Sequence, residues 1–169
     1  EVAETLDAGM FGNIFHEVMR SLYTSEEAMD PEFFFDGLGG AKSLKNVLRH
    51  ISRDYINSWL DREEDIKAKV KALIVHQMNA IEVTGRNLVV ADVIVRYVKK
   101  TLLSDLQLLK DEGKESFEIL GRELRVKGEY FGFRFKGFID RLDAFGPDEV
   151  RVVDYKTGKV LEDDWNIHD

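Results

Sequence analysis

The sequence predicts an α+β fold in which a helical part is followed by an antiparallel β-meander. Through the first two-thirds of the 169 residues, apolar residues recur every three to four positions, as in amphipathic helices. After Gly113 this spacing changes, and aromatic and β-branched residues become frequent, as in strands. With 44% hydrophobic residues, the chain has enough apolar side chains for the core of one domain.

Four helices are expected in the first part, at about residues 9–23, 42–60, 63–83 and 88–110. The first carries an apolar stripe that includes Phe11, Phe15 and Leu22. Asp30-Pro31 and the glycines near residue 40 mark a loop before the second helix. Gly113 is expected to end the fourth helix, because glycine readily takes the left-handed conformation found at helix C-termini.

The second part is expected to be rich in strands. Strand-like segments fall at about residues 117–120, 124–126, 130–135, 135–144 and 150–156. Between the last two, the five residues 145–149 contain Gly-Pro-Asp and have the composition of a hairpin loop. We therefore expect residues 1–169 to form a single domain, with a helical part at about 9–112 and a β-rich part at about 115–160.

Composition excludes several classes of protein. The chain has no cysteine, which rules out disulfides, thiolate metal sites and a cysteine nucleophile, and it favours a reducing, cytoplasmic location. Its apolar runs are too short to cross a bilayer, so no membrane partner is expected. The net charge of −8 is unlike that of a basic nucleic-acid coat protein, although residues 121–160 hold more basic than acidic side chains. The charged start without Met favours a piece of a larger protein.

The last predicted hairpin brings carboxylates together. If Ala144 pairs with Val150, then Asp140 lies opposite Asp154. Like charges that are directly opposed destabilise a sheet, but a divalent cation bound between them makes the arrangement favourable. Lys156 follows Asp154 by two residues and shares its face, where it can reach a phosphate or an attacking water. This pattern outlines a hydrolytic metal site.

The same strands also allow a simpler interpretation, in which these charged residues lie on a solvated face. Against it, the face of Asp140 is otherwise apolar and is expected to be core, with Leu142, Val150 and Val152. The opposite face carries the charged residues Arg141, Asp143 and Arg151. Because a slip of one residue would exchange the two faces, the pattern alone leaves both interpretations open.

His16 is a candidate ligand on the first helix. It follows Gly12 by four residues, so both share one helix face, and a glycine there allows another backbone to approach closely. A single histidine on a helix is more often a surface residue than a metal ligand, and both roles stay open from the residues alone.

These segments resemble the PD-(D/E)xK nuclease superfamily in its RecB-like branch. The resemblance rests on Gly-Phe-Ile-Asp-Arg-Leu-Asp at 137–143, Val-Asp-Tyr-Lys-Thr-Gly at 153–158 and Gly-Asn-Ile-Phe-His-Glu at 12–17. It implies a restriction-endonuclease-like core and a deoxyribonuclease that depends on Mg²⁺ or Mn²⁺. The metal ligands that it implies are His16, Asp140, Asp154 and the main-chain carbonyl of Tyr155. It also implies that Lys156 positions the attacking water and stabilises charge on the phosphate.

The resemblance further implies an exonuclease module of a bacterial recombination or repair helicase–nuclease, with DNA and a helicase domain or subunit as partners. Members of the branch continue into a helix with a Q-x-x-x-Y motif, which is missing before Asp169, so a C-terminally truncated core is expected. The family often has an auxiliary acidic residue before the metal-site strands, for which both Glu118 and Glu123 are candidates. The candidate contacts to a nucleic-acid backbone are Arg122, Arg125, Lys127, Arg134, Lys136 and Lys159.

Two other functions stay open. A nuclease-like fold without activity could bind DNA ends or act as a scaffold for a helicase. A metal-dependent hydrolase of another phosphate ester would use the same site on a different substrate.

Overall fold

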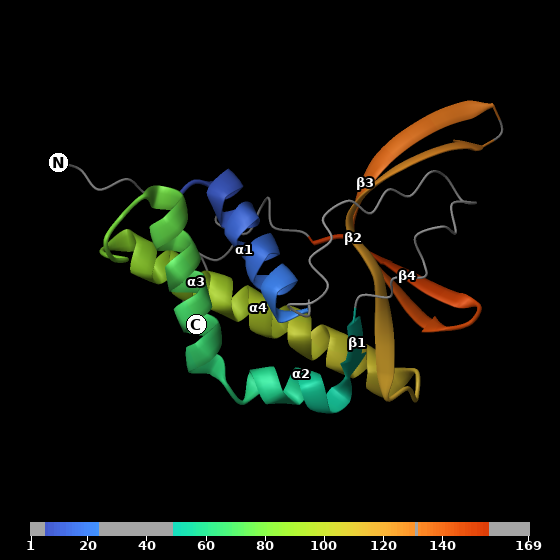
Figure 1. The fold of residues 1–169 in the computed structure, drawn as a ribbon, viewed down its shortest axis with the longest axis horizontal. Coiled ribbons are helices and arrows are strands. Elements are labelled where there is room, and N and C mark those ends of the chain that lie inside the picture. The colour runs from blue at the N-terminus through green and yellow to red at the C-terminus, as the bar shows by residue number, and fades with distance from the viewer. Residues whose placement is uncertain (1–5, 24–48, 131, 156–169) are drawn as a thin grey trace, which may run out of the picture. The chain divides into compact units, whose positions relative to one another are not determined.

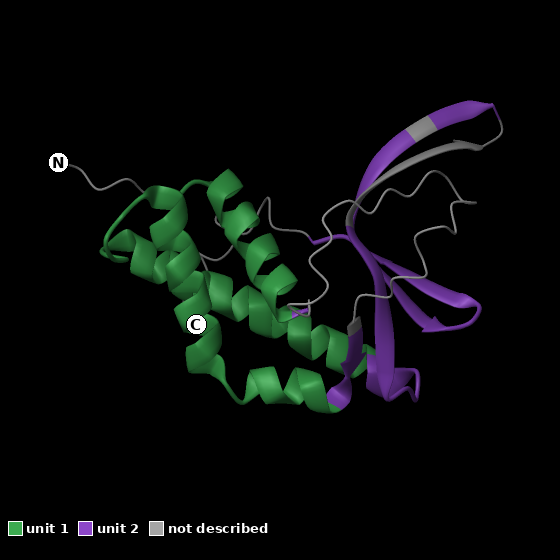
Figure 2. Ribbon diagram, viewed as in Figure 1, with its two compact units in different colours: residues 1–22, 54–108, 156–169 green, residues 23–53, 109–155 purple. Residues whose placement is uncertain are grey.

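The computed structural model describes residues 6–23, 49–130 and 132–155. Its elements, in chain order, are α1 (Ala8–Leu22), β1 (Arg49–Ser52), α2 (Arg53–Leu60), α3 (Glu63–Met78), α4 (Arg86–Asp111), β2 (Ser116–Tyr130), β3 (Phe133–Gly146) and β4 (Glu149–Val153) (Figure 1). Except for the short strand β1, the helices precede the strands, which confirms the predicted α+β class. The chain divides into two compact units, residues 1–22, 54–108 and 156–169 in the first and residues 23–53 and 109–155 in the second (Figure 2).

The first unit is helical in its described part, and α1 shows why. Asp7 accepts a hydrogen bond of 2.8 Å from the backbone N–H of Met10, which caps the start of the helix. The apolar stripe predicted from the sequence is buried: Phe11, Ile14, Phe15, Val18, Met19 and Leu22. The rings of Phe11 and Tyr97, on α1 and α4, meet edge to face with centroids 5.9 Å apart. Among the described residues, no helix is both long and apolar enough to cross a membrane.

The predicted helix 42–60 is wrong at residues 49–52, which form β1. These residues pair antiparallel with residues 116–119 of β2, and Ile51 is fully buried. The helix begins only at Arg53, whose guanidinium donates to the carbonyls of Lys114 and Leu109 at 2.8 and 3.1 Å. Strand pairing with a distant segment therefore overrides the helical spacing of the sequence here. Residues 42–48 lie outside the described residues, as does the predicted loop at 30–40.

The ends of α3 and α4 follow from two left-handed residues. The third helix was predicted to reach Val83 but ends at Met78, because Asn79 takes the left-handed conformation with φ 49° and caps it. The predicted stop of the fourth helix is confirmed: α4 ends at Asp111, and Gly113 has φ +63°.

The strands form one antiparallel sheet in the order β1-β2-β3-β4, which confirms the predicted meander. The predicted strand 130–135 is wrong only in its continuity: the chain turns between Tyr130, the last residue of β2, and Phe133, the first of β3, with Gly132 at φ +78°. Within the described residues, β1 pairs only with 116–119 and β4 only with 141–146. Residues 124–130 and 133–139 therefore extend as a two-stranded segment (Figure 1), which we call the distal ribbon.

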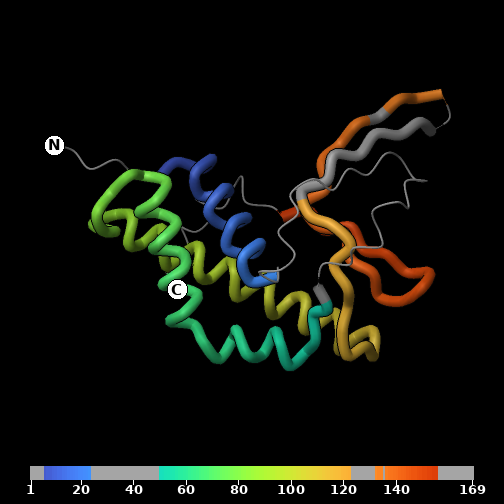
Figure 3. Tube along the Cα trace, viewed as in Figure 1, coloured from blue at the N-terminus to red at the C-terminus, as the bar shows by residue number. Residues whose placement is uncertain are grey.

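The predicted register of the β3–β4 hairpin is confirmed where it can be compared. Ala144 pairs with Val150, and Leu142 pairs with Val152. The connection is tighter than the expected five-residue loop, because the ladder continues to a Gly146–Glu149 pair with a bulge before it. The path of the chain through this hairpin can be followed in Figure 3. The paired part of β4 ends at Val153, not at residue 156 as expected.

Candidate active site

The central feature of the site is the carboxylate of Asp140 on β3. The backbone N–H of Tyr155 donates to Oδ2 of Asp140 over 2.6 Å. Asp140 is only 8% exposed, and it lies where β3 loses its backbone pairing with β4. A carboxylate thus takes the place of a backbone carbonyl at the end of the ladder, and it joins the two segments that the sequence predicted to share a metal.

The register places an acidic residue on each side of Asp140. On β2, Arg122 pairs with Arg141 and Leu124 with Ile139, so Glu123 holds the position opposite Asp140. On the other side Arg141 pairs with Val153, so Asp154 follows β4 at the position where the ladder would continue opposite Asp140. Three acidic positions therefore line up across three neighbouring segments.

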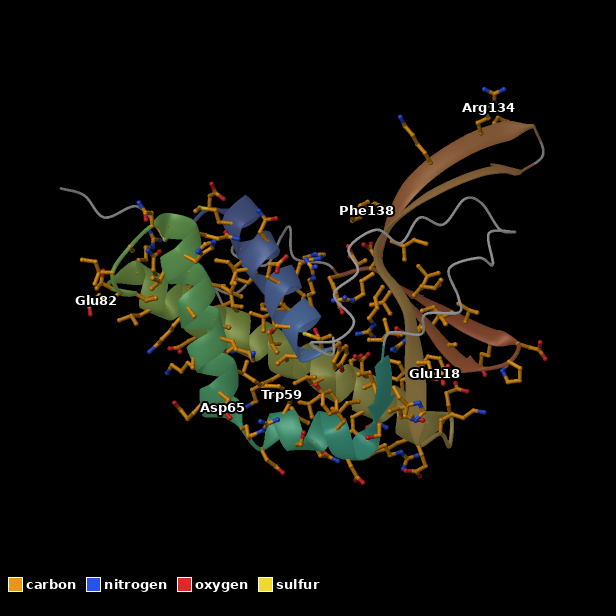
Figure 4. The ribbon with its side chains drawn as sticks, in the orientation of Figure 1. Trp59, Asp65, Glu82, Glu118, Arg134 and Phe138 are labelled. Carbon is orange, nitrogen blue, oxygen red and sulfur yellow. The ribbon has the colours of Figure 1, made fainter. Side chains whose placement is uncertain are left out.

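This register separates the two candidates for the auxiliary acidic residue. Glu118 pairs with Ala144, four residues along β3 from Asp140, and its carboxylate lies 3.7 Å from Nδ1 of His50 (Figure 4). Glu123 holds the position beside Asp140. The sequence leaves this choice open because the expected strand at 130–135 runs through Gly132 and hides the turn that sets the register. Counting back along both strands from that turn would have aligned Glu123 with Asp140.

The opposite face of the hairpin holds a buried ion cluster, which we define as Arg141, Asp143 and Arg151. The Nε and Nη2 atoms of Arg141 donate to the two oxygens of Asp143 at 2.9 and 3.0 Å. Arg151 donates to Oδ2 of Asp143 from Nη2 at 2.7 Å and from Nε at 3.0 Å. Such charge-assisted, forked hydrogen bonds offset much of the cost of removing these groups from water.

Aromatic rings complete the cover of the ion cluster. The guanidinium of Arg141 lies 5.1 Å from the ring centroid of Tyr23 and 5.3 Å from that of Phe117. The guanidinium of Arg151 lies 5.0 Å from the ring of Phe145, which itself stacks on Phe117. Cation–π contacts of this kind favour a buried guanidinium.

The prediction that the hairpin face of Leu142, Val150 and Val152 belongs to the core is therefore wrong in part. Leu142 is buried as predicted, but Val150 and Val152 are 56% and 60% exposed, whereas Arg141 and Asp143 are buried. The physical reason is that Asp143 accepts from both guanidiniums and that the guanidiniums pack on aromatic rings, so the charged face is the one that the aromatic side chains cover.

Burial raises the pKa of Asp143 above its ordinary value of 3.8, and the guanidiniums of Arg141 and Arg151 act in the opposite direction. Arg141 also reaches beyond the ion cluster, since its Nη1 donates to the hydroxyl of Tyr155 at 3.0 Å. Tyr155 thus makes two hydrogen bonds: its hydroxyl accepts from Arg141, and its backbone N–H donates to Asp140. These two bonds tether the segment that carries Asp154 to β3.

Comparison with protein families agrees with this arrangement. The family model of the PD-(D/E)XK nuclease superfamily matches residues 1–168. The chain belongs to the PD-(D/E)XK nuclease superfamily. Comparisons with curated proteins and with solved structures gave no match. Membership confirms the superfamily predicted from the motifs and indicates a hydrolase of nucleic acid, in a superfamily whose members generally use divalent metal ions.

The other predicted site residues of this PD-(D/E)XK nuclease are His16, Asp154 and Lys156. His16 lies on α1, partly buried, with its ring edge-on to Phe15 at 6.1 Å between centroids. It belongs to the first unit and Asp140 to the second, so their meeting stays a prediction. Lys156 lies outside the described residues. Asp154 is exposed, directly after β4.

The residues near Asp140 fit a hard divalent cation by their chemistry. The donors are carboxylate oxygens and the main-chain carbonyl of Tyr155, which Mg²⁺ and Mn²⁺ prefer over nitrogen or sulfur. Among the side chains that the structure describes, no three His, Asp or Glu residues are grouped as a metal cluster. The side chain of Glu123 lies outside that set, so a complete ligand set stays a prediction.

Proposed function

We propose that this chain hydrolyses phosphodiester bonds of DNA at a site built on Asp140, Asp154 and the main chain of Tyr155, with Mg²⁺ or Mn²⁺ as cofactor. The observation that carries the proposal is the hydrogen bond from Tyr155 N–H to Oδ2 of Asp140. It brings the aspartate of one family motif against the main chain of the other. The family match supports nucleic acid as the substrate class.

In this proposal the carboxylates of Asp140 and Asp154 and the carbonyl of Tyr155 hold the ion, and His16 supplies a further ligand. When bound, a divalent cation polarises the scissile phosphate and makes a water molecule easier to deprotonate. The chain contributes by orienting the ligands in advance. The backbone N–H of Tyr155 donates to the carboxylate of Asp140, and Arg141 donates to the hydroxyl of Tyr155. Ligands held in advance lose less freedom when they bind an ion.

Lys156 is proposed to act on the substrate. It follows Asp154 by two residues, and its ammonium would orient the attacking water and balance the negative charge that develops on the phosphate. Because an ammonium is no metal ligand, Lys156 should matter for cleavage and little for metal binding.

We further propose that the chain is a RecB-like exonuclease module that works with a helicase in DNA recombination or repair in the cytoplasm. The glycine-to-histidine segment at 12–17 supports this finer assignment, because it resembles the helix motif of that branch. The confirmed helix α1 carries that segment in a regular helical conformation.

The test is cleavage of labelled single-stranded and duplex DNA with Mn²⁺, with Mg²⁺ and with chelator. We expect metal-dependent cleavage that Asp140→Asn and Lys156→Ala abolish. The matched control is Asp148→Asn in the exposed β3–β4 turn, which removes one carboxylate outside the site and should leave cleavage unchanged. DNA binding without cleavage in every metal would instead favour a non-catalytic module. Cleavage by Asp140→Asn at the wild-type rate would refute the site.

A further inference from the structure

One face of β3 continues from Asp140 along the distal ribbon. The ladder between β2 and β3 has no register shift from residue 134 to residue 142, so alternate residues of β3 share a face. Arg134, Lys136 and Phe138 therefore lie on the face of Asp140. At about 3.3–3.4 Å per residue, this row extends roughly 20 Å from the proposed site, which is the length of several nucleotides.

The partners of this row on β2 are also mostly basic. Lys127 pairs with Lys136, and Arg125 pairs with Phe138, while Glu129 pairs with Arg134. Two of these three partner positions hold a basic residue, and the charge of a polyanion complements that of Arg134 and Lys136. The positions on this face thus favour a negatively charged ligand.

Phe138 adds a second, independent feature. It stands between Lys136 and Asp140 on the shared face, and it is 57% exposed. Figure 4 shows Phe138 and Arg134 projecting from the same side of β3. An exposed aromatic ring among basic residues is the arrangement on which proteins stack the bases of single-stranded nucleic acid while cations follow its backbone.

We propose that this face of the distal ribbon binds single-stranded DNA and leads it to Asp140. Arg134 and Lys136 contact backbone phosphates, and a base stacks on Phe138. A single strand is required, because in a duplex the base faces are covered by their neighbours in the stack. The proposal rests on the proposed nuclease function for the direction of the strand, but binding can be measured without cleavage.

The test is fluorescence anisotropy with labelled oligodeoxythymidylate of about 20 and about 3 nucleotides, in chelator so that no cleavage occurs. Phe138→Ala and Lys136→Ala should each weaken binding of both oligomers, that of the long one by about tenfold, because even the short one spans both side chains. Lys136→Ala should also lower the slope of log affinity against log salt by about 0.7, whereas Phe138→Ala should not change the slope.

The chain offers matched controls. Phe133 lies on the same strand but on the opposite face, and it is 78% exposed, so Phe133→Ala removes an exposed ring elsewhere. Lys110→Ala removes the same charge as Lys136→Ala from an exposed position on α4. Both control variants should bind the long oligomer as the wild type does. Equal losses in the controls would overturn the proposal.

An ester hydrolysis assay and competition experiments distinguish this proposal from the nuclease assignment. Hydrolysis of bis(p-nitrophenyl) phosphate with Mn²⁺ tests the metal site without any contact to the ribbon. If that ester is hydrolysed but the ribbon variants bind DNA normally, the binding face is wrong and the nuclease stands. If binding falls as expected but neither the ester nor DNA is cleaved, the face is supported and the nuclease fails. Competition by polyglutamate as strong as by DNA, or equal loss of duplex binding, would overturn a single-strand face.

Discussion

The backbone N–H of Tyr155 lies 2.6 Å from Oδ2 of Asp140, so the residue after Asp154 is fixed to the centre of β3. The hydroxyl oxygen of the same tyrosine accepts a hydrogen bond from Nη1 of Arg141, which belongs to the buried ion cluster on the other face. The proposed metal site and the ion cluster therefore meet at one residue. This link makes the stability of the hairpin and the order of the site testable together.

Asp140→Asn should remove the response to metal. Asparagine keeps an acceptor for Tyr155 N–H, so the fold should persist, but the charge that binds the cation is lost. For the wild type, Mn²⁺ at about 100 times its dissociation constant adds about 2.7 kcal/mol to the free energy of unfolding, a rise in Tm of roughly 5–10 °C. Thermal melts with Mn²⁺ and with chelator measure this. A full Mn²⁺ shift in Asp140→Asn would mean that the ion binds elsewhere.

Arg141→Met should be strongly destabilising. It leaves the buried carboxylate of Asp143 with one guanidinium and removes the donor to Tyr155, so we expect a loss of about 3–5 kcal/mol in urea unfolding. Tyr155→Phe removes only the hydroxyl contact and should cost about 1 kcal/mol while weakening the Mn²⁺ shift. Arg134→Ala, at an exposed position of β3, is the control and should change the stability by less than about 0.5 kcal/mol. A similar small change for Arg141→Met would contradict a stabilising role for the ion cluster.

Asp143 should give stability a pH dependence of defined sign. Burial raises its pKa above 3.8 in the folded chain, against the opposing guanidiniums of Arg141 and Arg151. The folded state then holds the proton at pH values where the unfolded chain has released it. The contribution of this group is full below pH 3.8 and is lost as the pH rises through the folded pKa.

Carbon-13 NMR titration of the Asp143 carboxyl measures this pKa directly, and each unit above 3.8 corresponds to about 1.4 kcal/mol. Urea unfolding over the same pH range provides the second measurement, since the stability of the wild type relative to Asp143→Asn should fall with rising pH. A titration midpoint below 3.8 would show that the two guanidiniums outweigh burial.

Glu123→Gln should reduce DNA cleavage by about 10- to 100-fold, because Glu123 holds the register position beside Asp140. Without metal the same change should stabilise the sheet by about 0.2–1 kcal/mol, since it removes one of two opposed like charges. Glu118→Gln is the matched control on the same strand. It loses the exposed pair with His50 and should leave cleavage unchanged. Equal cleavage by both variants would remove Glu123 from the site.

Short-range patterns were enough to predict α1, the end of α4 and the β3–β4 hairpin. The apolar stripe of α1 and the glycine after α4 depend on neighbours within a few residues, and both are as predicted. The pairing of Ala144 with Val150 also follows from local turn chemistry. Together with the motifs at both ends, this was enough to bring Asp140 to the segment of Asp154 and to indicate the superfamily.

Three other features depend on contacts that form only in the folded chain. Residues 49–52 form a strand because β2, more than sixty residues later, offers them an edge to pair with. Arg141 and Asp143 are buried in place of Val150 and Val152, because Tyr23 and Phe117 pack on the charged face. Glu123 holds the position opposite Asp140 because the turn at Gly132 sets the register between β2 and β3. Spacing along a chain shows which residues share a face, but which face is covered depends on segments that come from elsewhere in the chain.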